Sequence, residues 1–179
     1  MGILQTMSAM TTYMIAFTAR SGSTLLCDYL TANGLGYPTE YFQHPFGVAN
    51  KWHYDQLGCP PDDFMGFVSR LLVLRANNGI FGAKITWDQK NALLEEANRY
   101  NSTFHDMGDL FPGIKWIYLR RRDKVAQAVS LWRAAKTGRW HSTDPLPPNP
   151  YPPYDYFAIF RYFFLDFGRR VSVGSLFSN

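Results

Sequence analysis

The stretch YMIAFTARSGST, residues 13–24, decides the fold that the sequence predicts. It opens with an apolar run, 13–17, rich in β-branched and aromatic residues, which is typical of a buried strand. A polar turn of small residues follows. Behind the turn, apolar residues recur at helical spacing up to Leu30, and Gly34 is suited to end the helix. The stretch therefore predicts a strand, a turn and a helix in direct succession.

A turn of this kind can bind an anion, because free backbone N–H groups converge at a helix N-terminus and the helix dipole adds partial positive charge. Gly22 permits close approach of the backbone, and Arg20 can hold a phosphate or sulfate oxygen in bidentate fashion. Ser21, Ser23 and Thr24 add hydroxyl donors. The alternative is structural: one serine caps the helix, and Arg20 is a solvated surface residue. The segment alone leaves both interpretations open.

The turn lacks the sequence of a nucleotide-triphosphatase loop. A Walker loop needs G-x-x-x-x-G-K-[ST], and segment 18–24 has neither the first glycine nor the lysine. A triphosphatase also carries a carboxylate after a later strand to hold magnesium, whereas the apolar run 114–119 leads into Arg120-Arg121-Arg122. Basic residues there repel a metal and attract a second anion. The sequence thus predicts binding of phosphate esters without a metal, and a divergent nucleotide kinase is the weakest alternative.

Arg122 and Ser130 form the second candidate anion site. They lie eight positions apart, 130 − 122, which is about 12 Å along a fully helical segment. One phosphate can contact both only if the long side chain of Arg122 reaches forward from the preceding loop. The plain alternatives are a general basic patch at 120–122 and a polar helix position at Ser130.

The remaining patterns predict an α/β fold. A third apolar run, 79–85, reads as a strand, and apolar stripes at helical spacing cover 64–72 and 125–132, the latter with Asp123 as N-cap. Strands that alternate with helices favour a parallel sheet covered on both faces, a three-layer architecture with a P-loop-like phosphate-binding turn. Within a single domain over residues 1–179, we expect the proline-rich segment 142–153 to be an extended connector without helix.

Composition excludes several classes of protein. The chain has 179 residues, a net charge of +4, 46% hydrophobic and 18% charged residues, which argues against a disordered chain. No apolar stretch approaches the roughly 18 residues of a membrane span, and residues 1–12 lack the basic start of a secretory signal. Two cysteines, Cys27 and Cys59, cannot form a disulfide framework, which favours a reducing compartment. We expect a cytoplasmic protein.

The motifs together resemble the sulfotransferases that use 3′-phosphoadenosine-5′-phosphosulfate (PAPS), most closely the bacterial trehalose 2-sulfotransferase-like group. Four segments carry the resemblance, in the order TARSGSTLLC (18–27), GYPTEYF (36–42), FGAKITWDQ (81–89) and YLRRRDKVAQAVSLWRA (118–134). The resemblance extends over residues 13–156. Ala19 stands where the family usually has proline before the loop arginine, a change that removes no hydrogen-bond donor.

The resemblance implies a role for each site residue. Residues 20–24 (Arg20, Ser21, Gly22, Ser23 and Thr24) would bind the 5′-phosphosulfate, and Arg122 with Ser130 would bind the 3′-phosphate. Arg20 would also stabilise the charge that builds on the leaving phosphate. Glu40 matches the family's general base, which would accept the proton of an acceptor hydroxyl. Without the resemblance, a surface carboxylate would be the better interpretation of Glu40.

The acceptor side is less well marked. Lys84 and Trp87 follow a predicted strand and could line the acceptor pocket, although Trp87 fits the core equally well, and Trp132 falls on an apolar stripe that favours packing. Segment 139–141 could grip a sugar by stacking. The four histidines show no metal-ligand spacing, so we expect no metal. The expected partners are a carbohydrate acceptor and a second copy in a homodimer, with no nucleic acid.

The chain departs from the family at its C-terminal end. Family members continue with further helices, whereas here aromatic residues crowd segment 154–167 and a tail, 168–179, follows without clear period. The sequence is therefore interpreted as a truncated or frame-shifted relative, incomplete at its C-terminus. Two functions follow: a PAPS-dependent sulfotransferase that acts on a carbohydrate hydroxyl, or a catalytically silent nucleotide-binding or dimerisation module.

Overall fold

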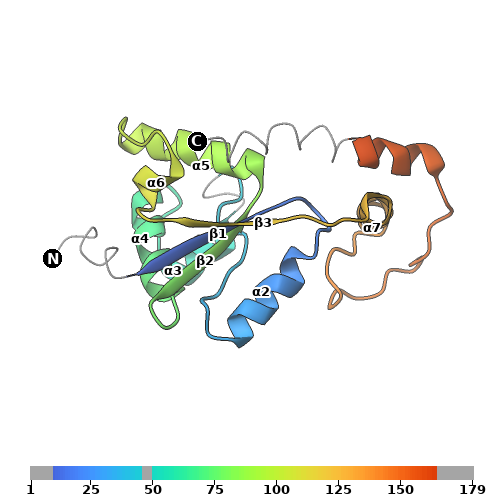
Figure 1. The fold of residues 1–179 in the computed structure, drawn as a ribbon, viewed down its shortest axis with the longest axis horizontal. Coiled ribbons are helices and arrows are strands. Elements are labelled where there is room, and N and C mark those ends of the chain that lie inside the picture. Colours follow the sequence, from blue (N-terminus) through green and yellow to red (C-terminus); the bar gives the residue numbers. More distant parts are fainter. Residues whose placement is uncertain (1–9, 46–49, 165–179) are drawn as a thin grey trace. The chain divides into compact units, whose positions relative to one another are not determined.

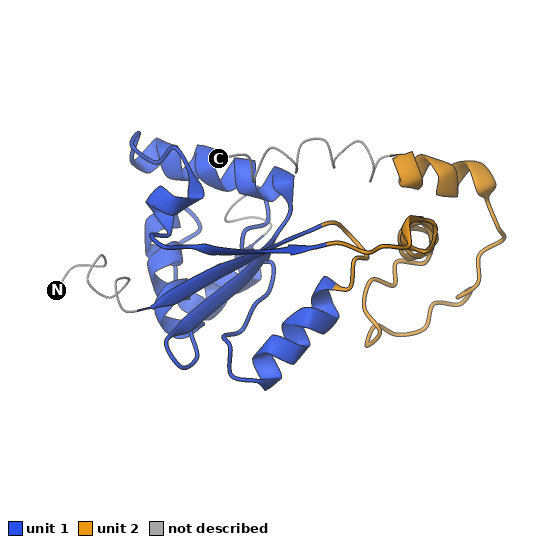
Figure 2. Cartoon of the chain, viewed as in Figure 1, with its two compact units in different colours: residues 1–17, 23–119 blue, residues 18–22, 120–179 orange. Residues whose placement is uncertain are grey.

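The computed structural model describes residues 10–45 and 50–164 of the chain. The chain forms two compact units, one of residues 1–17 and 23–119 and the other of residues 18–22 and 120–179 (Figure 2). Compact units of this kind can belong to one domain, so the single-domain organisation stays a prediction. The start of the chain examined for a secretory signal, up to residue 9, and the predicted tail, 168–179, lie outside the described residues.

The first unit is built on a small parallel sheet (Figure 1). Strands β1 (Thr11–Phe17), β2 (Ile80–Ile85) and β3 (Lys115–Leu119) lie in the order β2-β1-β3. Both neighbours run parallel to β1, with Ala16 opposite Ile85 and Phe17 opposite Leu119. The three predicted strands and the parallel sheet are confirmed. The carboxyl ends of the strands share one edge of the sheet, where the segments singled out from the sequence begin.

Helices of the first unit follow the apolar spacing of the sequence only in part. The predicted helices appear as α2 (Ser23–Ala32) and α4 (Phe64–Leu74). Gly34, just beyond α2, has a φ of +70°, as a glycine that ends a helix often does. Three further helices were not predicted: α3 (Lys51–Leu57), α5 (Trp87–Tyr100) and α6 (Met107–Leu110).

Alternate residues of the strands pack into two separate apolar clusters. Met14 of β1 and Phe81, Ala83 and Ile85 of β2 join a large cluster with buried residues of α3, α4, α5 and α6. Tyr13, Ile15 and Phe17 join a smaller cluster with Cys27 of α2. These clusters agree with a mixed α/β fold, and the full three-layer architecture stays a prediction.

The second unit combines the loop 18–22 with α7 (Lys124–Thr137) and a helical segment, 156–164. Asp123 caps α7 as predicted, since its Oδ1 accepts a hydrogen bond from the Ala126 N–H at 2.8 Å. Trp132 is buried in a cluster with Ala128 and Ile159, which confirms its packing role. Residues 142–153 contain neither helix nor strand. In the described ranges 10–45 and 50–164, no helix has the length and apolar character to cross a membrane.

Candidate functional site

The loop 18–22 has an unusual backbone. The Ser21 N–H donates to the Thr18 carbonyl at 3.2 Å, which closes a tight turn. Arg20 has a φ of +63° and Gly22 a φ of +94°, both in the left-handed region. No atom would lie within 4 Å of a Cβ at Gly22, so the torsion and not a lack of space favours glycine there. Arg20 adopts the same region without that freedom, which is a strained arrangement often found at functional sites.

Helix α7 holds this loop with two polar side chains. Gln127 Nε2 donates to Thr18 Oγ1 at 2.9 Å and to the Ala19 carbonyl at 2.7 Å. Arg20 Nε donates to Ser130 Oγ at 2.9 Å. Sequence reasoning found Arg20 and Ser130 but missed Gln127. The available signal was its spacing, because Gln127 and Ser130 are three residues apart and therefore share one face of the helix.

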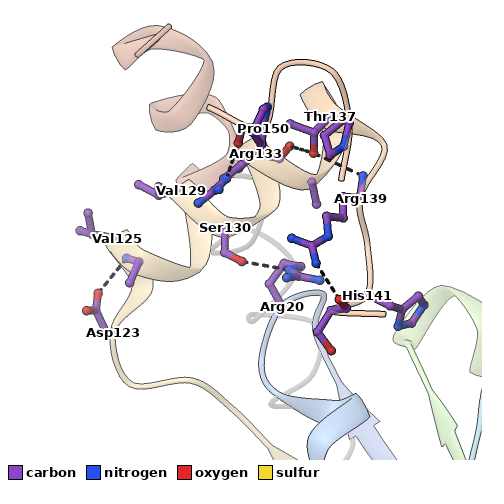
Figure 3. A pocket seen from close by; sticks show the side chains of 14 residues that line it. Arg20, Asp123, Val125, Val129, Ser130, Arg133, Thr137, Arg139, His141 and Pro150 are labelled. Atoms are coloured by element: carbon purple, nitrogen blue, oxygen red, sulfur yellow. Dashed lines mark hydrogen bonds between the residues drawn. The ribbon is translucent and has the colours of Figure 1, made fainter. Parts of the chain in front are cut away.

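A cavity of about 690 Å³ lies beside Arg20 and Ser130 (Figure 3). One side of α7 and the segment 139–150 supply the rest of its wall. The lining residues are Arg20, Asp123, Val125, Ala126, Val129, Ser130, Arg133, Ala134, Thr137, Arg139, His141, Ser142, Pro147 and Pro150. The lining contains three arginines and one carboxylate, so the charge of the wall favours an anionic ligand.

The three arginines also hold the segment 139–150 in place. Arg133 Nε donates to the Pro150 carbonyl at 3.0 Å, and Arg139 Nε donates to the Asp144 carbonyl at 3.1 Å. Arg20 Nη1 donates to the Trp140 carbonyl. The wall of the cavity opposite α7 is thus attached by guanidinium groups, and two of the residues expected to grip an acceptor, Arg139 and His141, belong to it.

Arg122 is exposed and is absent from the lining of this cavity within the part of the chain that the structure describes. The hydroxyl of Ser130, which the sequence paired with Arg122, accepts a hydrogen bond from Arg20 instead. The structure therefore shows a direct hydrogen bond between one residue of each expected anion site, Arg20 and Ser130. A shared phosphate between Arg122 and Ser130 stays a prediction.

The first unit contains a second polar cluster, centred on Lys84. Lys84, at the end of β2, has a side chain that is 7% exposed, and its Nζ lies 3.0 Å from Glu40 Oε1 and 3.4 Å from Thr24 Oγ1. The other carboxylate oxygen of Glu40 accepts a hydrogen bond from Gln89 Nε2 at 3.3 Å. The side chain of Glu40 keeps 28% of its surface exposed. The cluster therefore fixes a carboxylate that water or a ligand can still reach.

Local backbone contacts bring Glu40 to Lys84. The Lys84 N–H donates to the Thr39 carbonyl at 2.9 Å, which attaches the segment after α2 to the edge of β2. Gly36, with a φ of +88°, passes so close to β2 that a Cβ would lie 2.9 Å from the Ile80 carbonyl oxygen. Only glycine satisfies both the torsion and this approach.

Trp87 lies apart from the contacts that hold Glu40. It is the first residue of α5, is half-buried, and carries the Lys90 ammonium 4.5 Å from its ring centre. Burial lowers the pKa of Lys90. An acceptor-binding role for Trp87 stays a prediction.

Two buried groups near the motifs bear on the chemistry. The Ser21 hydroxyl is buried and has no hydrogen-bond partner among residues 10–45 and 50–164. An orphaned hydroxyl in a loop of this kind suits a ligand oxygen, because a buried polar group without a partner is unfavourable. Burial raises the pKa of Cys27 to about 11, so this thiol is a poor nucleophile at neutral pH. In the described ranges no three His, Cys, Asp or Glu side chains are placed to hold a metal ion.

Comparison with known proteins identifies relatives of the chain. It is 31% identical over 159 residues to trehalose 2-sulfotransferase of Mycolicibacterium smegmatis, a match that covers 73% of this chain and 59% of the relative. It is 29% identical over 157 residues to trehalose 2-sulfotransferase of Mycobacterium tuberculosis, covering 72% of this chain and 58% of the relative. The chain thus spans less than two thirds of the length of these curated relatives.

Residues 12–161 match the sequence profile of the family described as Stf0 sulphotransferase. This range contains all four segments that carried the resemblance, from the loop after β1 to α7. The chain belongs to the Stf0 sulphotransferase family.

Proposed function

We propose that the protein is a sulfotransferase that transfers a sulfuryl group from PAPS to the hydroxyl of a carbohydrate, with trehalose or a similar sugar as acceptor. The hydrogen bond between Arg20 and Ser130 carries the proposal, because these residues are 110 positions apart and the resemblance assigns both to one donor molecule. The names of the curated relatives support the reaction class and the choice of acceptor.

Residues 20–24 would hold the 5′-phosphosulfate of the donor. The loop offers the guanidinium of Arg20, the orphaned hydroxyl of Ser21 and the backbone beside Gly22, and Ser23 and Thr24 begin α2. Ser130 and Arg122 would hold the 3′-phosphate. A guanidinium and hydroxyl groups bind phosphate and sulfate oxygens without help from a metal.

Glu40 would act as the general base. During transfer, the acceptor oxygen forms a bond to sulfur while the bond from sulfur to the phosphate oxygen breaks, and the hydroxyl proton passes to the carboxylate. Lys84 would orient that carboxylate through its 3.0 Å contact and would stand next to Thr24 at the start of α2. Arg20 would stabilise the negative charge on the departing phosphate. In this proposal Lys84 acts on the base and on the start of α2, more than as a lining residue of the acceptor pocket.

The alternative is a silent binding module of the same family. The contact of Glu40 with the buried Lys84 supports an active enzyme instead, since a module that only binds nucleotide has no use for a fixed carboxylate. The relatives' names, which denote enzymes, point the same way.

Transfer of radiolabelled sulfate from PAPS to a panel of disaccharides tests the proposal. We expect transfer by the unmodified chain and a loss of roughly 10²–10⁴-fold in kcat for Glu40→Gln, which cannot accept the proton. Binding of 3′-phosphoadenosine-5′-phosphate, measured by calorimetry, should stay within a few-fold of the unmodified protein. Glu95→Gln, an exposed carboxylate on α5, is the matched control and should retain full turnover.

Each contrary result has a distinct meaning. Absence of both nucleotide binding and transfer would reject the donor assignment. Tight nucleotide binding without transfer to any sugar would favour the silent module. Full turnover by Glu40→Gln would leave the enzyme but remove Glu40 as its base.

A further inference from the structure

Gln127 is a polar residue that the proposed reaction does not use, yet it is only 1% exposed. Its amide makes three hydrogen bonds. The oxygen accepts from Lys124 Nζ at 2.5 Å, and the nitrogen donates to Thr18 Oγ1 and to the Ala19 carbonyl. Both bonds from the nitrogen therefore end on the loop 18–22 that contains Arg20.

We propose that Gln127 is a positioning residue: it sets the backbone of the loop and, through the backbone, the place of the Arg20 guanidinium. This inference rests on the proposed function, in which Arg20 touches the donor. Gln127 itself touches no reacting atom.

The geometry of one peptide unit supports the role. Gln127 holds the carbonyl of Ala19 at 2.7 Å, and this carbonyl shares a planar peptide group with the N–H of Arg20. Fixing the carbonyl toward α7 therefore fixes that N–H on the opposite side. The next torsion along the chain is the φ of Arg20, which is +63°. A residue with a Cβ keeps such a value only where surrounding contacts hold it, and the Gln127 bond is adjacent to that torsion.

Helix α7 fixes both the backbone and the side chain of Arg20. Gln127 fixes the peptide before its Cα, and Ser130, three residues later on the same face of the helix, accepts from its Nε at 2.9 Å (Figure 3 shows the Ser130 contact). If the loop relaxed to a negative φ, the side chain of Arg20 would leave the backbone in a different direction. The contact to Ser130 would then be lost, and the guanidinium would no longer face the donor.

Two variants separate positioning from simple filling of a buried space. Gln127→Met keeps the approximate shape but removes all three hydrogen bonds, and Gln127→Glu keeps the shape but cannot donate when ionised. Trp132→Phe is the control, because Trp132 is buried on the same helix but packs against Ile159 and Ala128. Its melting temperature measures the loss of packing in α7, and its kcat/KM shows how much activity such a loss removes.

Kinetics provide the first readout. We expect kcat/KM for PAPS to fall by about 10- to 100-fold in Gln127→Met and Gln127→Glu, the range that a small misplacement of a charged group produces. The KM of the carbohydrate should change by less than about two-fold, since Arg20 acts on the donor. Trp132→Phe should keep kcat/KM at a comparable loss of melting temperature. Unchanged kcat/KM for PAPS in both Gln127 variants would overturn the inference.

Hydrogen exchange provides a second readout that does not depend on catalysis. Backbone amides of residues 18–22 should exchange faster in Gln127→Met than in the unmodified chain, and Trp132→Phe should leave them unchanged. Equal exchange in Gln127→Met and the unmodified chain would reject the positioning role even if the protein transferred no sulfuryl group. Faster exchange in an inactive protein would instead support the positioning role and count against the proposed function alone.

Discussion

Two ion pairs of nearly equal length have very different surroundings. Lys84 and Glu40 lie 3.0 Å apart with side chains 7% and 28% exposed, whereas Lys51 and Asp55 lie 2.8 Å apart on the surface of α3 at 69% and 56%. Solvent weakens the second pair, and ordering two long side chains offsets most of its gain. Burial strengthens the first pair and makes the loss of one partner unfavourable.

Double-mutant cycles should give different coupling free energies for these two ion pairs. For Glu40→Gln and Lys84→Met we expect a coupling in the free energy of unfolding of about 1–3 kcal/mol, because the residues share one buried network. For Asp55→Asn and Lys51→Met we expect about 0.3–0.5 kcal/mol. Denaturant titration of each variant measures both values. Equal couplings would mean that burial does not strengthen the Lys84 pair.

For single residues, the sequence indicated candidate side chains but not how these side chains pair. Arg20, Ser130, Glu40 and Lys84 were all singled out, yet the bond from Arg20 to Ser130 was not anticipated. Partners 110 positions apart leave no local pattern in one sequence. Gln127 was missed for a related reason: a glutamine on a helix is usually solvated, and the two loop residues that accept its hydrogen bonds lie 109 and 108 positions away in the sequence.

At the scale of elements, apolar spacing explains which helices and strands were predicted. Strands β1 and β2 and helix α4 bury clear apolar runs or stripes. Strand β3 buries none of its residues completely, and α7 buries only Ala128 and Trp132 of its predicted stripe, yet both elements were predicted from the apolar pattern. Helix α5 buries only Leu93 and Ala97 along its 14 residues, so its stripe is weak. The sequence nonetheless marks the start of α5, because Thr86 and Gln89 form a capping box.

The turn after α7 should respond to pH through Asp144. Its carboxylate accepts hydrogen bonds from the backbone N–H groups of His141, at 2.6 Å, and Trp140, at 2.8 Å, and the His141 bond contributes most to lowering the pKa of Asp144. A carboxyl whose pKa is lowered on folding stabilises the turn above its unfolded pKa, near 4, and loses that contribution as pH falls. We therefore expect the turn 140–144 to loosen below about pH 4.

Amide hydrogen exchange at Trp140 and His141 between pH 5 and pH 3, corrected for the intrinsic pH dependence of exchange, measures this loosening. Asp144→Asn is the control, since its side chain carries no charge at any pH in this range. The same corrected pH response in Asp144→Asn and in the unmodified chain would show that another group is responsible.

For the molecule as a whole, the reactivity of the two cysteines shows how readily the core of the first unit opens. Cys27 and Cys59 are both free and buried. Burial raises the pKa of both thiols, that of Cys27 to about 11. A thiol with so high a pKa is almost wholly protonated at pH 8, whereas about one ordinary cysteine thiol in four is ionised at that pH. The thiolate is the reactive form, so ionisation and access both slow its reaction.

We expect a disulfide reagent such as dithionitrobenzoate to react with the native protein at pH 8 at least about 100-fold more slowly than after unfolding in denaturant. The rate for Cys27 should increase as the pH is raised toward 11, and Cys59→Ser isolates that contribution. Reaction of the native chain as fast as the denatured chain would show that the core around α2 opens readily.

The division into units also determines how the molecule can be dissected in the laboratory. The backbone passes from one unit to the other after residues 17, 22 and 119, so the second unit is not one continuous piece of chain. A recombinant fragment that starts at Arg120 would contain α7 but not Thr18, Ala19 or Arg20. The amide of Gln127 would then lose both of its acceptors, a defect worth about 1–3 kcal/mol. Segmental isotope labelling or split-protein designs should therefore supply the peptide around residues 18–22 together with the C-terminal portion.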